Sequence, residues 1–136
     1  MTTPTNTDLL RSIFDDLAVG DALRFVDALA DDVTLTVTGD YSWSRTFTGK
    51  ESVLRDLYGY VGSRTTGQGR WTATNIIGGG DWVVVEARGD LVAVDGTPYR
   101  NEYCLLYRLS GGRIVEIREY EDSIMAERVL GPYPTD

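Results

Sequence analysis

The sequence has 136 residues, with 21 acidic and 13 basic side chains, one cysteine and no histidine, and this composition excludes several classes of function. Without histidine, His-based catalytic triads, His-ligated metal centres and imidazole bases cannot form. The net charge of −8 argues against nucleic acid and anionic membranes as partners, because both require a basic surface. Cys104 stands alone, so the chain forms no internal disulfide, which fits a reducing compartment. Carboxylates, tyrosines, arginines and lysines are left to carry any chemistry.

The length predicts a single domain with one hydrophobic core. We expect residues 8–130 to form this domain, with residues 1–7 as a flexible N-terminus and residues 131–136 as a tail. No apolar run reaches the ~18 residues of a membrane span, and the first residues lack the basic start and apolar stretch of a secretory signal. A cytoplasmic protein is therefore expected.

Apolar residues at helical spacing predict three helices in the first half of the chain. We expect them over residues 9–17, 22–29 and 48–61, with a strand over residues 33–38 between the second and the third. The stretch 39–47 is rich in turn residues, and we interpret it as a loop.

The second half of the chain alternates in the manner of antiparallel strands. We expect strands over residues 71–77, 82–94, 99–109 and 113–121, after a loop over residues 62–69 and before a short helix over residues 123–130. Asp95-Gly96 is typical of a two-residue type I′ turn, and Gly111-Gly112 marks the next hairpin. Helices followed by strands predict an α+β fold.

Charged side chains occupy alternate positions of the strand over residues 82–94. Glu86, Arg88 and Asp90 share one face, because side chains alternate across a sheet. These residues have two interpretations, a polar wall of a pocket or an ordinary solvated sheet face.

The facing strand adds polar groups to this set. A two-residue turn at Asp95-Gly96 would place Asn101 opposite Asp90 and Tyr103 opposite Arg88. Eight Tyr and three Trp against three Phe suit a pocket that holds an apolar molecule and orients its oxygens, although each ring is also an ordinary core candidate. The candidate ligand-contacting residues are Trp43, Tyr58, Glu86, Asn101, Tyr103 and Tyr107.

The order of elements and three segments resemble the NTF2-like superfamily, and within it the SnoaL-like proteins. The segments are residues 29–34, residues 47–53 and residues 111–122. The resemblance implies an NTF2-like (cystatin-like) α+β cone, in which three N-terminal helices pack on a curved, mostly antiparallel sheet around an internal pocket. Polyketide cyclases, ketosteroid isomerases and limonene-epoxide hydrolases share this fold, so the resemblance is specific for fold and weak for reaction.

The resemblance to limonene-epoxide hydrolases also implies catalytic residues. That family carries an Arg-x-Asp pair that matches Arg88 and Asp90, and an Asp on the last strand where this chain has Glu119. The implied roles are Glu119 as base, Asp90 as acid and Arg88 as the bridge that separates their pKa values. No metal and no cofactor are implied.

Two features qualify these roles. A strict two-residue turn at Gly111-Gly112 would turn Tyr120 inward, so Glu119 faces the pocket only if this hairpin contains a bulge, which the resemblance favours. Leu35 and Val37 stand where the epoxide hydrolases hold their water, which favours proton transfer over water attack.

We therefore expect a protein that binds a small, apolar, oxygenated molecule and acts as a cofactor-free acid/base enzyme of the isomerase, cyclase, dehydratase or epoxide-hydrolase type. A non-catalytic ligand-binding or accessory protein is the alternative.

The opposite face of the sheet mixes apolar and charged residues. We expect this face to form a homodimer interface, as in relatives. Its members are Val83, Val85, Arg100, Glu102, Leu106, Arg108, Ile114, Glu116 and Arg118.

Overall fold

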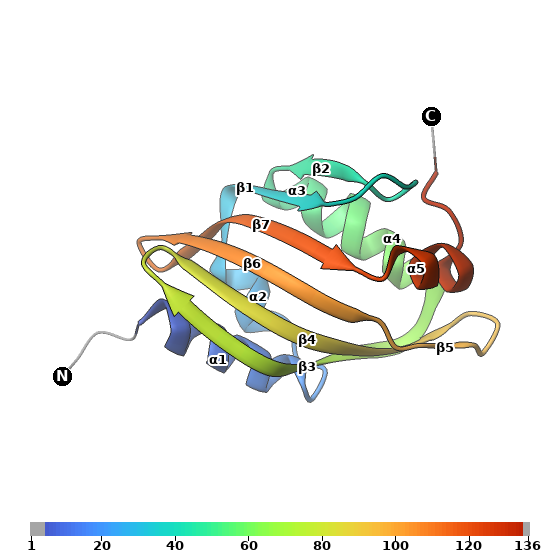
Figure 1. The fold of residues 1–136 in the computed structure, drawn as a ribbon, viewed down its shortest axis with the longest axis horizontal. Helices are drawn as coiled ribbons and strands as arrows, with labels where there is room; N and C mark the ends of the chain where they lie inside the picture. Colours follow the sequence, from blue (N-terminus) through green and yellow to red (C-terminus); the bar gives the residue numbers. More distant parts are fainter. Residues whose placement is uncertain (1–4, 135–136) are drawn as a thin grey trace.

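The computed structural model describes residues 5–134 and confirms the α+β fold, a curved sheet with helices against one of its faces (Figure 1). The helices are α1 (Asn6–Leu17), α2 (Leu23–Ala28), α3 (Lys50–Ser52), the π-helix η1 (Val53–Tyr58), α4 (Gly59–Arg64) and α5 (Ser123–Leu130). The strands are β1 (Leu29–Val37), β2 (Arg45–Thr48), β3 (Thr65–Gly79), β4 (Trp82–Ala93), β5 (Pro98–Tyr99), β6 (Glu102–Ser110) and β7 (Arg113–Glu121).

The sheet has the order β2-β1-β7-β6-β4-β3, with β5 paired to β4. Strands β1 and β7 run parallel, and the other pairings among the described residues are antiparallel. Alternation along β1 buries Val33, Leu35 and Val37 against the helices, and the same rule fills the concave face from the other strands. Within residues 5–134 no helix has the length and apolar character of a membrane span.

Helix α1 begins at Asn6 because Thr5 and Asp8 form a capping box, in which each side chain accepts the other residue's backbone N–H. Residues 5–7 of the segment expected as a flexible N-terminus thus form the cap and the first residues of α1. Residues 1–4 of that segment and residues 135–136 of the expected tail lie outside the described residues.

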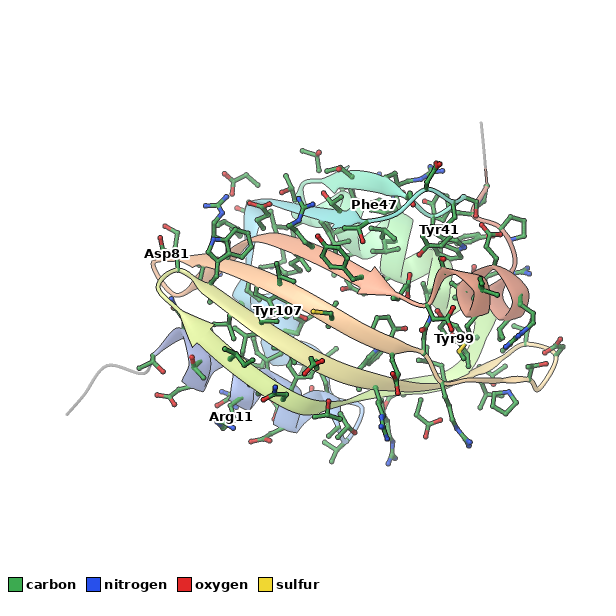
Figure 2. All side chains as sticks on the ribbon, viewed as in Figure 1. Arg11, Tyr41, Phe47, Asp81, Tyr99 and Tyr107 are labelled. Atoms are coloured by element: carbon green, nitrogen blue, oxygen red, sulfur yellow. The ribbon has the colours of Figure 1, made fainter. Side chains whose placement is uncertain are left out.

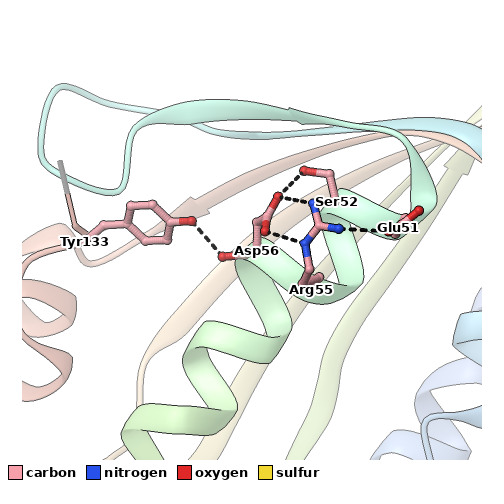
Figure 3. Close-up of polar contacts among 5 residues, drawn as sticks. All are labelled: Glu51, Ser52, Arg55, Asp56 and Tyr133. Atoms are coloured by element: carbon pink, nitrogen blue, oxygen red, sulfur yellow. Dashed lines mark hydrogen bonds and ion pairs between the residues drawn. The ribbon is translucent and has the colours of Figure 1, made fainter. Parts of the chain in front are cut away.

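The third helical region runs without a break from α3 through η1 to α4, so a π-helical segment occupies the middle of the single helix expected there. Arg55 pairs with Glu51 and Asp56 on its outer surface, at 2.8 and 2.9 Å (Figure 3). The Tyr133 hydroxyl, from the C-terminal segment, donates to the Asp56 carbonyl at 2.7 Å (Figure 3). Tyr133 also packs edge-on against Trp43, which fastens this segment to the body of the domain.

The β4–β6 connection differs from the two-residue turn expected at Asp95-Gly96. The Ala93 N–H donates to the Thr97 carbonyl, so Val94 joins Asp95 and Gly96 in the loop, and Gly96 supplies the positive φ of 89°. Arg88 therefore pairs with Glu102, and Tyr103 with Ala87. The pairing between β4 and β6 is therefore shifted by one residue from the expected pairing. Because side chains alternate along a strand, Arg88 and Tyr103 lie on opposite faces of the sheet instead of on the same face.

Three residues expected on the outer face lie in the core. Val83, Val85 and Ile114 are each 0 % exposed and point toward the helices. Their charged neighbours on the same strands point the other way.

The β6–β7 hairpin contains the expected bulge. Leu109 pairs with Ile114 and Arg108 pairs with Glu116, so Val115 is an extra residue on β7. Beyond it Glu119 pairs with Leu105, on the face turned toward the helices.

Two regions expected as loops are strands. Residues 45–48 form β2 at one edge of the sheet, and β3 begins at Thr65 instead of Trp71. Both segments lie in edge strands, where short or glycine-containing sequences pair with one neighbour only.

Candidate functional site

A pocket of about 250 Å³ lies between the concave face of the sheet and the helices. Its wall is mainly apolar, and most strands and helices contribute to it. This volume lies just below the ~300 Å³ at which pockets for drug-sized ligands begin, so the pocket suits a small molecule. The aromatic members of the wall are Phe14, Phe25, Trp43, Tyr58, Trp71, Tyr99, Tyr103 and Tyr107.

Two carboxyl groups from β7 enter this wall. Glu119 and Glu121 are two residues apart, so both point to the same face, and Glu119 is 9 % exposed. Burial, the charge of Glu121 and a hydrogen bond to Glu121 raise the pKa of Glu119 well above its usual value. Burial raises the pKa of Glu121 as well, whereas hydrogen bonds from Tyr41, Glu119 and Tyr99 oppose that rise. The hydrogen bond between the two groups therefore favours Glu119 as the holder of a proton that the pair shares.

Tyrosine hydroxyls hold Glu121 in place. Tyr41 donates to Oε1 at 2.7 Å, and Tyr99 donates to Oε2 at 3.4 Å. Both tyrosines lie toward the end of the molecule where α5 sits (Figure 2). Tyr103 donates in turn to the Tyr99 hydroxyl. These donors stabilise the ionised form of Glu121 in preference to that of Glu119.

Two further hydroxyls reach the pocket without a protein partner. Tyr58 and Tyr107 line it, and in the described part of the chain neither hydroxyl makes a hydrogen bond. Burial raises the pKa of both phenols, and the nearby charge of Glu119 adds to the effect. They remain protonated, and their O–H groups are available to a ligand oxygen.

The predicted set of Arg88, Asp90 and Glu119 does not assemble, and this is a correction to the sequence interpretation. Arg88 pairs with Glu102 at 3.5 Å on the outer face, and its side chain is 71 % exposed. Asp90 pairs with Arg100 at 3.4 Å on the same face. The physical reasons are the three-residue loop 94–96, which pairs Arg88 with Glu102 in place of Tyr103, and the alternation of β4, whose inward positions are filled by apolar residues and Gly89.

Glu86 and Asn101 were expected to contact the ligand, and neither lines the pocket. Glu86 is exposed on the outer face, where it accepts a hydrogen bond from Asn75 at 3.2 Å. Asn101 is 0 % exposed and is committed to structural hydrogen bonds, with its amide donating to the Tyr99 hydroxyl at 2.8 Å and to the Asp122 carbonyl at 3.0 Å. Asn101 therefore orients Tyr99, and through it Glu121.

The remaining candidates lie together as expected. Trp43, Tyr58, Tyr103, Tyr107 and Glu119 all line the pocket.

Sequence reasoning missed Glu121, Tyr99, Tyr41 and Trp71. The signal for Glu121 was present, because a bulge that turns Glu119 inward also turns inward the residue two positions later.

The fold and this site define a class: a small α+β domain whose curved sheet and helices form an aromatic pocket that carries acidic side chains. The profile of the SnoaL-like domain matches residues 10–117, and the chain belongs to this family. No curated protein matches it.

Solved structures agree on the fold. An NTF2-like protein of unknown function from Burkholderia pseudomallei is 22 % identical with a TM-score of 0.77, over 93 % of this chain and 98 % of that one. A putative isomerase from Bacillus subtilis is 18 % identical with a TM-score of 0.72, over 94 % of each chain. A hypothetical protein with a ketosteroid isomerase-like fold from Catenulispora acidiphila, in complex with trimethylamine, is 19 % identical with a TM-score of 0.72, over 96 % and 95 %.

Proposed function

We propose that the protein binds a small, largely apolar, oxygenated molecule and catalyses a cofactor-free proton transfer of the isomerase or cyclase type. The observation that carries this proposal is the Glu119–Glu121 pair, in which two carboxyl groups whose pKa values are raised by burial lie side by side in an apolar pocket. Environments that push two carboxyl pKa values apart are typical of acid/base pairs. The putative isomerase from Bacillus subtilis shares the fold and supports this class of reaction.

The chemistry follows from the groups present. The ionised member of the pair accepts a proton from a carbon next to a carbonyl, and the electron pair moves onto the carbonyl oxygen. The Tyr58 and Tyr107 hydroxyls donate hydrogen bonds to that oxygen as it gains charge. The protonated pair then returns the proton to another atom of the same molecule, which completes an isomerisation or a ring closure with no net gain or loss of protons.

Water attack has less support at this site. Leu35 and Val37 are fully buried in the core and offer no polar atom that could hold a water molecule. We therefore place epoxide hydrolysis behind proton transfer. The cytoplasmic location stays a prediction.

Hydrogen–deuterium exchange tests the proposal without knowledge of the natural substrate. The protein would be incubated in D₂O with small cyclic ketones, and deuterium at the carbons next to the carbonyl would be followed by NMR. We expect wild-type exchange well above buffer, and a loss of about 10²-fold or more in Glu119→Gln and Glu121→Gln. Asp90→Asn is the matched control, because its carboxylate lies on the outer face and should leave exchange unchanged.

Two results would count against the catalytic role. Ketones that bind without exchange would identify a non-catalytic ligand-binding protein. Equal loss in the Asp90 variant would show that the wrong carboxylates were chosen.

A further inference from the structure

The two carboxyl groups in the pocket wall face no basic side chain of the described residues. Among the wall residues of the described chain, none is Lys or Arg, whereas Glu119 and Glu121 are both present. The Glu121 carboxyl group accepts hydrogen bonds from the Tyr41 and Tyr99 hydroxyls, and no wall residue of the described chain supplies a cation to it. A ligand that brings a positive charge would supply the missing partner, and a carboxylate or phosphate would be repelled.

The rings of the wall favour the same kind of ligand. Trp43 and Trp71 contribute indoles, and Tyr58, Tyr103 and Tyr107 contribute phenols. Aromatic faces carry the negative part of the ring quadrupole, and several of them around one space attract ammonium groups, most strongly where water is excluded. Gly69 and Gly89 provide the space for the Trp71 ring. A Cβ atom at Gly69 would lie 2.9 Å from this ring, and a Cβ atom at Gly89 would lie 3.1 Å from it.

A hydrogen-bonding group without a partner shows that the ligand is also polar. Tyr107 is 3 % exposed, its ring is fixed edge-on against Phe14 at 6.2 Å, and its hydroxyl has no hydrogen bond within residues 5–134. A purely hydrocarbon ligand would cover this hydroxyl without giving it a hydrogen-bond partner, which is unfavourable.

We propose that the pocket takes a small organic cation, a protonated or quaternary amine that also carries an oxygen function. The ammonium group lies against Glu119, Glu121 and the ring faces, and the oxygen accepts from Tyr107. This inference names the ligand class of the pocket to which the proton transfer is assigned, and it rests on that pocket and not on the reaction itself.

A pair of isosteric probes tests the charge directly. Choline and 3,3-dimethylbutan-1-ol have the same shape and hydroxyl group, and they differ in a quaternary nitrogen against a quaternary carbon. Titration followed by calorimetry should show choline bound about tenfold more tightly or better. Glu121→Gln should remove the preference, whereas Glu86→Gln, a matched change on the exposed outer face, should keep it. Equal binding of the two probes, or no binding of choline at ~10 mM, would overturn the proposal.

A high salt concentration distinguishes cation binding in the pocket from cation binding to the acidic surface, and this test needs no variant. At about 0.5 M NaCl the Debye length is ~4 Å, so attraction to the exposed charges of the protein is screened while a buried contact persists. A preference that survives in the wild-type protein supports the pocket, and one that disappears places the cation on the surface and refutes the inference. The exchange experiment uses neutral ketones, so its failure and the failure of charge preference are seen separately.

Discussion

Glu119 connects the chemistry of the pocket to folding. It is the acidic side chain that the described residues bury most deeply, and its pKa is raised by burial and by Glu121. Between its unfolded pKa near 4.5 and its higher folded pKa, the folded state binds more protons than the unfolded state. The contribution of Glu119 to stability is therefore full below pH 4.5 and is lost as the pH rises toward the folded pKa.

We predict that Glu119→Gln stabilises the protein at neutral and alkaline pH and has little effect in acid. The variant has no group to ionise at this position and keeps an amide that can donate to Glu121. Thermal unfolding from about pH 4 to pH 8 would measure the difference, and a gain of 1 kcal/mol would appear as ~4 °C in Tm. Glu102→Gln, whose side chain is 76 % exposed, is the control. Parallel stability curves for wild type and the Glu119 variant would contradict the assignment.

At the scale of elements, Gly89 decides the shape of the pocket. It lies on the inward face of β4, where a Cβ would be 3.0 Å from Tyr103 Cε1 and 3.1 Å from Trp71 Nε1. A residue of normal size cannot fit beneath the two rings without displacing them.

Gly89→Ala should therefore push Trp71 and Tyr103 into the pocket, weaken ligand binding about tenfold and cost ~1–3 kcal/mol of stability. Urea unfolding and probe titration would measure both effects. Gly79→Ala is the matched control on the adjacent strand, since its Cβ would meet nothing within 4 Å. Unchanged binding in the Gly89 variant would show that these rings do not shape the ligand space.

Local patterning predicted the elements well because it depends on neighbouring residues. The apolar spacing around Leu10 and Ile13 specified α1, and alternation specified β4 and β7. Which residues lie opposite each other on two paired strands depends instead on the length of the loop that connects the strands. Asp95-Gly96 is a strong turn signal, yet Val94 joined the loop, so Arg88 pairs with Glu102 in place of Tyr103 and lies on the solvent-exposed face. The network that holds Glu121 brings together strands distant in sequence, which no local pattern encodes.

At the scale of the whole molecule, we propose that the outer face of the sheet joins two copies of the chain. The helices leave this face uncovered (Figure 1). Half-buried Val84 and Leu106 lie there beside Arg118, and Arg108 pairs with Glu116 at 3.0 Å. Such a mixture of apolar and paired charged groups is typical of subunit interfaces.

Sedimentation at micromolar concentration should show a dimer, and Leu106→Arg should shift it toward monomer by at least about tenfold in Kd. Val19→Arg is the control, because Val19 is 69 % exposed on the turn after α1. A monomeric wild-type protein would refute this interface.

The bulge at Val115 also bears on how proteins of this fold diverge. If Val115 paired with Arg108 and the bulge were lost, Glu119 and Glu121 would turn outward, and Arg118 and Tyr120 would face the cavity. A cavity lined by Glu119 and Glu121 and one lined by Arg118 and Tyr120 therefore differ by a one-residue shift of this pairing, with the strand sequence preserved. Distant relatives have to be matched by hairpin geometry before their site residues are compared, because equal spacing in sequence does not guarantee that two side chains face the same space.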